Sequence, residues 1–428
     1  MEETGGEEKM KAGKSMAPAL IAAHPDGSCV VVAVGAALRI FNLLREEPVQ
    51  VQDDTLPAGH GDVIRAVAFD LHNSLFASVG DDKLVKLWDA TAWTCIKTVR
   101  LSKKASAVTF SHDSAWLLVA DKFGIVYVFS TVQHDAIHKP VLILAHCCSI
   151  ITGLCCSPDG KYIVTSDRDF KIRVTKFPEN PLTGAHDIHT YCLGHTNFVA
   201  CVAFIGFQGL LISGGGDATL RLWEYETGAL LDTFDTTDEV CILIIQHTSI
   251  DFFLSLFRHA PSGGLSVGCC RFEGVLLFAC DMVERQLSLL QVSFLWSENA
   301  PPTSLSFDSG GNLWLVSGAA ETVEMGDEFV TPEALAVAQV QAQGIARAAV
   351  THVQVVRDCV LLGGTSVPGG ELLLHTLQGH QAGVQDVTAA TEAAELAMKN
   401  LLSKRQYTAE QREHRKRMRN DKVVSLAS

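Results

Sequence analysis

Two histidine–aspartate pairs in this sequence have the residue types of a general-base pair and an identical spacing. They are His60 with Asp82 and His195 with Asp217, and the separation along the chain is the same in both pairs. An imidazole oriented by a carboxylate is a common proton acceptor in enzymes. The same residue types also serve as buried hydrogen-bonding partners in structural repeats, so the surrounding elements must decide between these interpretations.

The densest charge in the chain lies in the stretch TSDRDFKIRVTKF, residues 165–177. Seven consecutive positions hold five charged residues, which are Asp167, Arg168, Asp169, Lys171 and Arg173. Strand-forming residues alternate with the later charges, namely Phe170, Ile172 and Val174. The pattern predicts a β-strand. Its charged residues could form a catalytic cluster, stabilise the fold or form a docking patch for another molecule.

A repeat explains the histidine–aspartate spacing. Residues 59–89 read GHGDVIRAVAFDLHNSLFASVGDDKLVKLWD, and residues 194–224 read GHTNFVACVAFIGFQGLLISGGGDATLRLWE. A tryptophan follows the histidine at the same distance in both segments, and three repeat periods of about 45 residues separate one segment from the other. A Gly-His start and a Trp-Asp end at this period are the WD-repeat signature, in which each repeat forms one four-stranded blade.

The repeat favours a structural role for the histidine–aspartate pairs, because a relay of His, Ser or Thr, Asp and Trp satisfies buried polar groups and holds a turn. In a weaker copy, His146 precedes Asp169 by nearly the same spacing, so we expect Asp169 to be a buried turn residue. We therefore predict no catalytic residue. The predicted structural repeat residues are His60, Asp82, Trp88, His146, Asp169, His195, Asp217 and Trp223.

The repeats predict an all-β fold, a WD-repeat β-propeller of seven four-stranded blades over residues 16–380. Two degenerate copies carry Phe41 and Phe129 in the tryptophan position. Residues 1–15 are acidic and polar and are expected to be a disordered N-terminus. The predicted blades are 16–58, 59–101, 102–144, 145–193, 194–238, 239–300 and 301–376.

Composition limits the classes of function. The net charge of −14 argues against a propeller that wraps nucleic acid by itself. Thirteen cysteines are present without a CxxC spacing. We expect them to be reduced, buried small side chains, and we expect no metal site, although His146 followed by Cys147 and Cys148 resembles one. No secretory signal or membrane span is apparent, so we expect a soluble intracellular protein.

The C-terminal segment, residues 386–428, has a different composition and predicts a basic helical tail. From residue 404 onward, the sequence contains eight Lys or Arg and three Asp or Glu. This tail is expected to contact nucleic-acid phosphates or to direct nuclear import, and a solvated helix is the alternative. Its basic residues are Lys404, Arg405, Arg412, Arg415, Lys416, Arg417, Arg419 and Lys422.

Comparison of the repeats leaves part of the charge cluster unexplained. The position of Arg173 is basic in sister repeats, where it is Lys86 or Arg221. Lys171 and Arg168 have no such counterpart. Alternation places Lys171 and Arg173 on the same side of one strand, with Arg168 expected on the exposed turn before it. These three residues predict either a local basic docking patch or a solvated blade edge.

Three stretches together resemble one family: SPDGKYIVTSDRDFKIRV (157–174), YCLGHTNFVACVAF (191–204) and GGGDATLRLWEYETG (214–228). They are similar to the WD-repeat, non-catalytic subunit of the tRNA (guanine-N7-)-methyltransferase. The tail KRQYTAEQREHRKR resembles the plant branch of that family. The DRDxKIRV phrase is the specific element, since the WD signature alone fits many adaptors.

The resemblance implies a scaffold subunit, not an enzyme. It implies a heterodimer with a separate catalytic subunit, which binds S-adenosylmethionine and methylates a guanine in the tRNA variable loop; no cofactor is expected on this chain. It further implies that Arg168, Lys171 and Arg173 bind that partner through an acidic residue, that tRNA is bound mainly through the complex, and that the protein is nuclear. The alternative is a general WD adaptor, such as a substrate receptor of a ubiquitin ligase.

Overall fold

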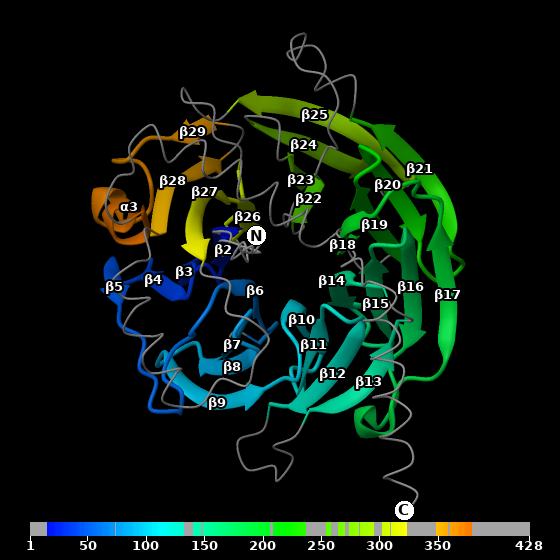
Figure 1. Ribbon diagram of the computed structural model, residues 1–428. Helices are drawn as coiled ribbons and strands as arrows, with labels where there is room; N and C mark the ends of the chain where they lie inside the picture. The colour runs from blue at the N-terminus through cyan, green and yellow to red at the C-terminus, as the bar shows by residue number, and fades with distance from the viewer. Residues whose placement is uncertain are drawn as a thin grey trace, which may run out of the picture.

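The computed structural model is a ring of β-sheets around a central axis (Figure 1). It describes residues 15–72, 74–131, 140–146, 149–205, 209–236, 254–257, 264–269, 274–281, 283–294, 302–308, 310–322, 348–357 and 360–378. Residues 1–14 of the predicted N-terminal segment 1–15 and the whole predicted tail 386–428 lie outside the described residues. No helix in the described ranges is long and apolar enough to cross a membrane.

The described strands form seven sheets, in each of which neighbouring strands are antiparallel. The first three are β2 (Leu20–Ala23), β3 (Cys29–Val34), β4 (Ala37–Asn42) and β5 (Glu47–Val49); β6 (Ile64–Phe69), β7 (Leu75–Gly80), β8 (Leu84–Asp89) and β9 (Thr94–Arg100); β10 (Ala105–Phe110), β11 (Trp116–Asp121), β12 (Ile125–Ser130) and β13 (Val141–Ala145).

The next three sheets have the same strand order. They are β14 (Ile151–Cys156), β15 (Tyr162–Asp167), β16 (Lys171–Lys176) and β17 (Ile188–Leu193); β18 (Val199–Ile205), β19 (Leu210–Gly215), β20 (Thr219–Glu224) and β21 (Ala229–Asp235); β22 (Leu254–Phe257), β23 (Gly264–Cys269), β24 (Gly274–Asp281) and β25 (Gln286–Phe294). A short 3₁₀ helix, η1 (Pro181–Thr183), lies between β16 and β17.

The seventh sheet contains β26 (Ser304–Phe307), β27 (Leu313–Thr322), β28 (Ala348–Arg357) and β29 (Val360–Leu362), and β1 (Ser15–Pro18) adds to it by pairing with β27. The innermost strands contact one another in sequence, and β2 contacts β26, so the ring is closed (Figure 1). The predicted β-propeller is confirmed. The predicted last blade, 301–376, does not end in a strand, because residues 370–378 are helical, as α3 (Gly370–Gln378).

Burial explains why the central strands are apolar on both faces. All six residues of β3, CVVVAV, are buried because a sheet in the ring packs against a neighbour on each side. Six of the seven hydrophobic clusters among the described residues join side chains of two adjacent sheets. The cluster at the closing seam, for example, combines Val30 and Phe41 of the first sheet with Trp314 of the last. Leu373 and Leu377 of α3 are buried in the same cluster, so the helix covers the seam.

The histidine–aspartate pairs hold the turn between the second and third strands of a sheet. Nδ1 of His60 lies 2.8 Å from Oδ2 of Asp82, and its Nε2 lies 2.8 Å from Oγ of Ser78. The indole N–H of Trp88 donates to the same Ser78 oxygen at 2.9 Å. Asp82 also accepts the backbone N–H of Leu84 at 2.9 Å. The pair is therefore a structural relay, as the repeat predicts.

The same relay recurs in the fifth sheet. His195 lies 2.7 Å from Oγ of Ser213 and 3.0 Å from Oδ2 of Asp217, and Trp223 donates to Ser213 at 2.8 Å. Burial would raise the pKa of Asp217, but hydrogen bonding and charge attraction from His195 outweigh it and hold that pKa well below its ordinary value. We call the end of the ring that carries these contacts the relay end.

The third relay corrects a prediction. His146 pairs with Asp167, 3.0 Å away, and with Thr165 at 2.7 Å, whereas the side chain of Asp169 is 43% exposed. Asp167 occupies the strand-end position that Gly80 holds in β7. A Cβ at Gly80 would lie only 2.9 Å from Oδ1 of Asp82. The site beside the histidine has space for one carboxylate. In the fourth sheet Asp167 occupies it, and Asp169 is displaced to the surface.

The basic residue shared by the sister repeats is also structural. Lys86 is fully buried, and its ammonium group donates to Oδ2 of Asp53 at 2.7 Å. Its other acceptors are Thr55 at 3.1 Å, the carbonyl oxygen of Pro57 at 2.8 Å and Thr98 at 2.9 Å. Burial would raise the pKa of Asp53, but hydrogen bonds from Lys86 and Thr55 lower it to about 2. This position carries an internal ion pair.

Substitution of the two neighbouring aspartates should separate their roles. Asp167→Ala leaves His146 and the backbone N–H of Lys171 without their acceptor, so we expect it to lower the free energy of unfolding by about 1–3 kcal/mol, as Asp217→Ala should. Asp169→Ala should change it by no more than about 0.5 kcal/mol. Urea unfolding followed by circular dichroism measures both. Equal effects of the two substitutions would contradict the assignment.

Removal of the buried cation should be costly and dependent on pH. Lys86→Met leaves the Asp53 carboxylate buried without its cation, and we expect a loss of about 3–5 kcal/mol at pH 7. Because the folded pKa of Asp53 is depressed, its stabilising contribution is present above pH ~4 and is lost as the pH falls toward 2. The difference in unfolding free energy between the two proteins should therefore narrow below pH ~4. A constant difference would count against the ion pair.

Candidate docking surface on the fourth sheet

The local fold places the charged stretch around the turn between β15 and β16. Asp167 ends β15 and Lys171 begins β16, so Phe170 is a turn residue and the prediction that it belongs to the strand is wrong. Its φ of 71° is left-handed, as is that of Lys83 and Ala218 at the equivalent turns. The left-handed turn is thus general to the repeat, and the large apolar side chain at this position distinguishes the fourth sheet.

Lys171 is the exposed cation of this turn. Its backbone N–H donates to Oδ1 of Asp167 at 3.0 Å, which fixes the start of β16. Its side chain is exposed, and within the part of the chain that the structure describes, its ammonium group has no hydrogen bond or ion pair. On a chain with a net charge of −14, this free cation is available to an acidic group of another molecule.

Arg173 occupies a different environment, although it lies on the same side of β16. It is 9% exposed, and its Nη1 donates to the carbonyl oxygen of Ala145 at the end of β13, 3.1 Å away. Burial lowers the pKa of its guanidinium group below the ordinary value, against the opposing effects of Tyr191 and Asp167. Arg173 thus resembles Lys86, and it supports the seam between the third and fourth sheets.

Arg168 does not lie on an exposed turn as predicted. It is 7% exposed, and its Nη2 lies 3.5 Å from Oδ1 of Asp169. The predicted basic patch of three residues is therefore wrong in its geometry. Lys171 presents its charge to solvent, whereas Arg168 and Arg173 are largely buried.

Exposed apolar side chains lie near Lys171 on the turn and on the neighbouring strand, and the sequence did not predict their role. Phe170 is 42% exposed, Tyr191 40% and Leu193 59%. Leu193 of β17 is the cross-strand partner of Lys171, and Tyr191 is the partner of Arg173, so these side chains share one face of the sheet. In the structure the stretch YCL in β17 alternates exposed and buried residues, but all three residues are apolar, so the sequence alone did not mark Tyr191 and Leu193 as exposed. We define the docking surface as Phe170, Lys171, Tyr191 and Leu193.

The predicted tail contacts, residues 404–422, lie outside the described residues. Within the described ranges, no group of three or more His, Cys, Asp or Glu side chains is placed to hold a metal ion. Cys155 and Cys156 lie in β14 at the fourth sheet, and burial raises the pKa of both thiols, that of Cys156 to about 12. Cys147 and Cys148 are not described.

Comparison with known proteins shows the family to which the chain is related. Residues 131–293 match the family model of the tRNA methyltransferase TRM82 WD40 domain, and residues 52–89 match the WD domain, G-beta repeat. The tRNA (guanine-N(7)-)-methyltransferase non-catalytic subunit wdr4 of Danio rerio is 33% identical over 307 residues, which cover 68% of this chain and 71% of the relative. The chain belongs to this family of non-catalytic subunits.

Other family members give the same assignment. The Xenopus laevis subunit is 37% identical over 61% of this chain and 64% of its own length, and the Homo sapiens subunit is 34% identical over 52% and 51%. The matched part thus spans half to about two thirds of these two relatives. The relatives' names agree with the expectation that the chain is not itself the enzyme, and the region matched by the methyltransferase family model contains the whole docking surface.

Solved structures agree on the fold. The structure of U3-55K has a TM-score of 0.58 with 20% identity and covers 71% of this chain and 89% of its own. The RRP9 WD40 repeats have the same TM-score and identity, over 71% and 88%. At this level of identity, the likeness concerns the propeller fold alone.

The two cations of β16 should respond differently to charge reversal. Arg173→Glu places a carboxylate in a buried site near Asp167, and we expect it to lower the unfolding free energy of the isolated chain by about 3 kcal/mol or more. Lys171→Glu should change it by no more than about 0.5 kcal/mol, because the side chain is exposed. Thermal and urea unfolding of the two variants provide the measurement. A strong loss of stability in Lys171→Glu would contradict its placement on the surface.

Proposed function

We propose that this chain is the scaffold subunit that binds and stabilises the catalytic subunit of a tRNA (guanine-N7-)-methyltransferase, and so supports N7-methylation of a guanine in the tRNA variable loop. The observation that carries the proposal is the docking surface: an exposed lysine without a partner among the described residues, beside three exposed apolar side chains on a sheet of a closed ring. Membership in a family named for non-catalytic subunits supports it.

The docking surface has the composition of a protein interface. Tyr191, Phe170 and Leu193 supply apolar area that a partner would remove from water, and aromatic side chains often carry much of the energy of binding. Lys171 at their edge would pair with a carboxylate of the catalytic subunit and set its orientation. Arg173 would act indirectly, because it holds the seam behind Tyr191 through the carbonyl group of Ala145. Arg168 is largely buried beside Asp169 and would support the turn.

The proposal also covers where the cofactor binds, how tRNA is bound and where in the cell the complex acts. S-adenosylmethionine would bind to the catalytic subunit, and this chain would carry no cofactor. The tRNA would be bound mainly by the complex, with the basic residues of 404–422 adding contacts to phosphate groups. The complex would act in the nucleus, and the cluster HRKRMR at 414–419 is a basic segment of the kind that directs import.

Reversal of the exposed charge should break the complex. We expect Lys171→Glu to weaken binding of the purified catalytic subunit by about 2–5 kcal/mol, because like charges would then face each other at the interface, and to reduce tRNA methylation by the mixture accordingly. Binding is measured by calorimetry and methylation by transfer of a labelled methyl group.

The matched control for this prediction is Lys176→Glu. Lys176 lies at the opposite end of the same strand, where it pairs with Asp187 at 2.6 Å, and its substitution changes the net charge equally. It should leave binding of the catalytic subunit nearly unchanged. Full binding by the Lys171→Glu variant, or equal losses in both variants, would refute the docking surface. The general-adaptor alternative would gain support if the purified chain did not bind the catalytic subunit at all.

Deletion of residues 404–428 tests the role of the tail. The complex should bind tRNA more weakly and with a flatter dependence on salt, because fewer counterions are released from the phosphates. Assembly with the catalytic subunit should not change. An unchanged salt dependence together with loss of nuclear accumulation would show that the tail is an import signal and does not contact tRNA.

A further inference from the structure

A cavity of about 600 Å³ opens between the third and fourth sheets, at the end of the strands opposite to the relay end. Its walls are residues 111–113 and Trp116 of the third sheet, and residues 160–162 and 176–179 of the fourth. Lys171 begins β16 at the relay end and Lys176 ends it at the cavity, so the cavity is separate from the docking surface. Its volume is typical of a ligand pocket.

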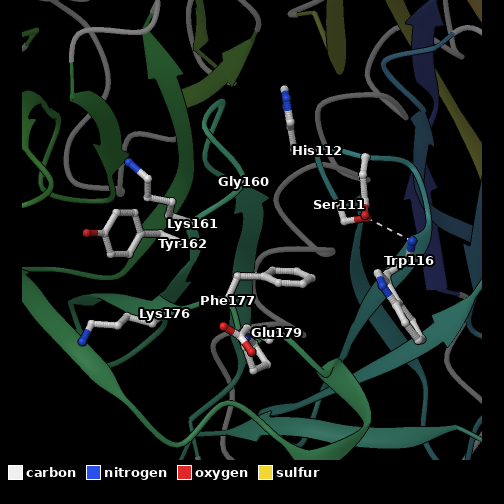
Figure 2. A pocket seen from close by; sticks show the side chains of 11 residues that line it. Ser111, His112, Trp116, Gly160, Lys161, Tyr162, Lys176, Phe177 and Glu179 are labelled. Carbon is white, nitrogen blue, oxygen red and sulfur yellow. Dashed lines mark hydrogen bonds between the residues drawn. The ribbon is translucent and has the colours of Figure 1, made fainter.

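Two aromatic rings face this cavity from opposite sides. Figure 2 shows the Phe177 ring extending from the fourth sheet toward Ser111 and Trp116, which lie at the two ends of the loop before β11. That loop is held in place, because Oγ of Ser111 accepts the backbone N–H of Trp116 at 3.0 Å and donates to Asp113. The indole N–H of Trp116 has no hydrogen bond within the described ranges. The position of Trp116 is thus fixed before a ligand binds, and its indole N–H is available to a hydrogen-bond acceptor of the ligand.

The charge balance of the cavity favours a cation. Its two lysines are already neutralised, since Lys161 pairs with Asp159 at 3.1 Å and Lys176 pairs with Asp187 at 2.6 Å. Glu179 is exposed and forms no ion pair with any residue that the structure describes. Asp113 adds a second negative charge to the lining. An anionic ligand would have to compete with the existing ion pairs, whereas a cation would find uncompensated carboxylates.

We propose that this cavity binds an arginine side chain of a basic linear peptide presented by a partner protein. The guanidinium group would lie against the faces of Trp116 and Phe177 and pair with the carboxylate of Glu179. Arginine suits the site better than lysine, because its planar, weakly hydrated guanidinium group stacks on aromatic rings while donating in its plane. The volume exceeds that of one side chain, so residues flanking the arginine would also enter the cavity.

The test uses the full-length chain and a fluorescein-labelled nonapeptide, GSGRMRGSG, followed by fluorescence anisotropy. A second peptide carries citrulline in place of both arginines, which keeps the shape and removes the charge. We expect the arginine peptide to bind at least about tenfold more tightly than the citrulline peptide. Equal affinities, or no binding of the arginine peptide, would overturn the proposal.

Variants of the chain localise the binding. Glu179→Gln and Trp116→Leu should each raise the Kd for the arginine peptide at least about tenfold, whereas Glu371→Gln, an exposed carboxylate on α3, should change it less than about twofold. Glu179 is exposed, so its variant keeps the fold even if Trp116→Leu does not. An unchanged Kd in Glu179→Gln would refute the site. Displacement of the peptide by a ten-nucleotide RNA whose own affinity falls in Trp116→Leu would assign the cavity to nucleic acid instead.

Discussion

The turn between the second and third strands of a sheet has space for one buried carboxylate beside its histidine. Where the second strand ends in glycine, as at Gly80, the aspartate two residues later fills that space. Where the strand ends in Asp167, the carboxylate of that residue fills it and Asp169 moves outward. This steric limit therefore determines which residues of the fourth turn are available to solvent, and Phe170 and Lys171 are among them.

Three basic residues of β16 differ in role because their surroundings differ. Lys171 is at the relay end without a partner among the described residues, Arg173 is in the seam against Ala145, and Lys176 is paired with Asp187 beside the cavity. A desolvated cation needs its acceptors and therefore stabilises the fold, whereas a solvated one retains its charge for a partner. One short strand thus supports the ring, the proposed docking surface and one wall of the cavity.

Closure of the ring makes these surfaces rigid. The seam between the first and last sheets is joined by β1 on β27 and covered by α3, so each described sheet packs against two neighbours. A binding surface built on such sheets loses little conformational entropy when a partner binds. This property suits a subunit that orients another protein without carrying out the reaction itself.

The sequence by itself determined the repeat, its period, the histidine–aspartate relays at His60 and His195 and the propeller, because these depend on spacing along the chain. The DRDxKIRV phrase indicated the family by resemblance. It also directed attention to Lys171. Tertiary structure decided the rest: that Asp167 replaces Asp169, that Arg168 and Lys86 are buried, and that Tyr191 and Leu193 are exposed beside Lys171. Burial depends on the register between strands and on the neighbouring sheet, and a cavity depends on loops from two sheets. The residues that these contacts bring together are not separated by any regular spacing in the sequence, so the sequence alone does not reveal them.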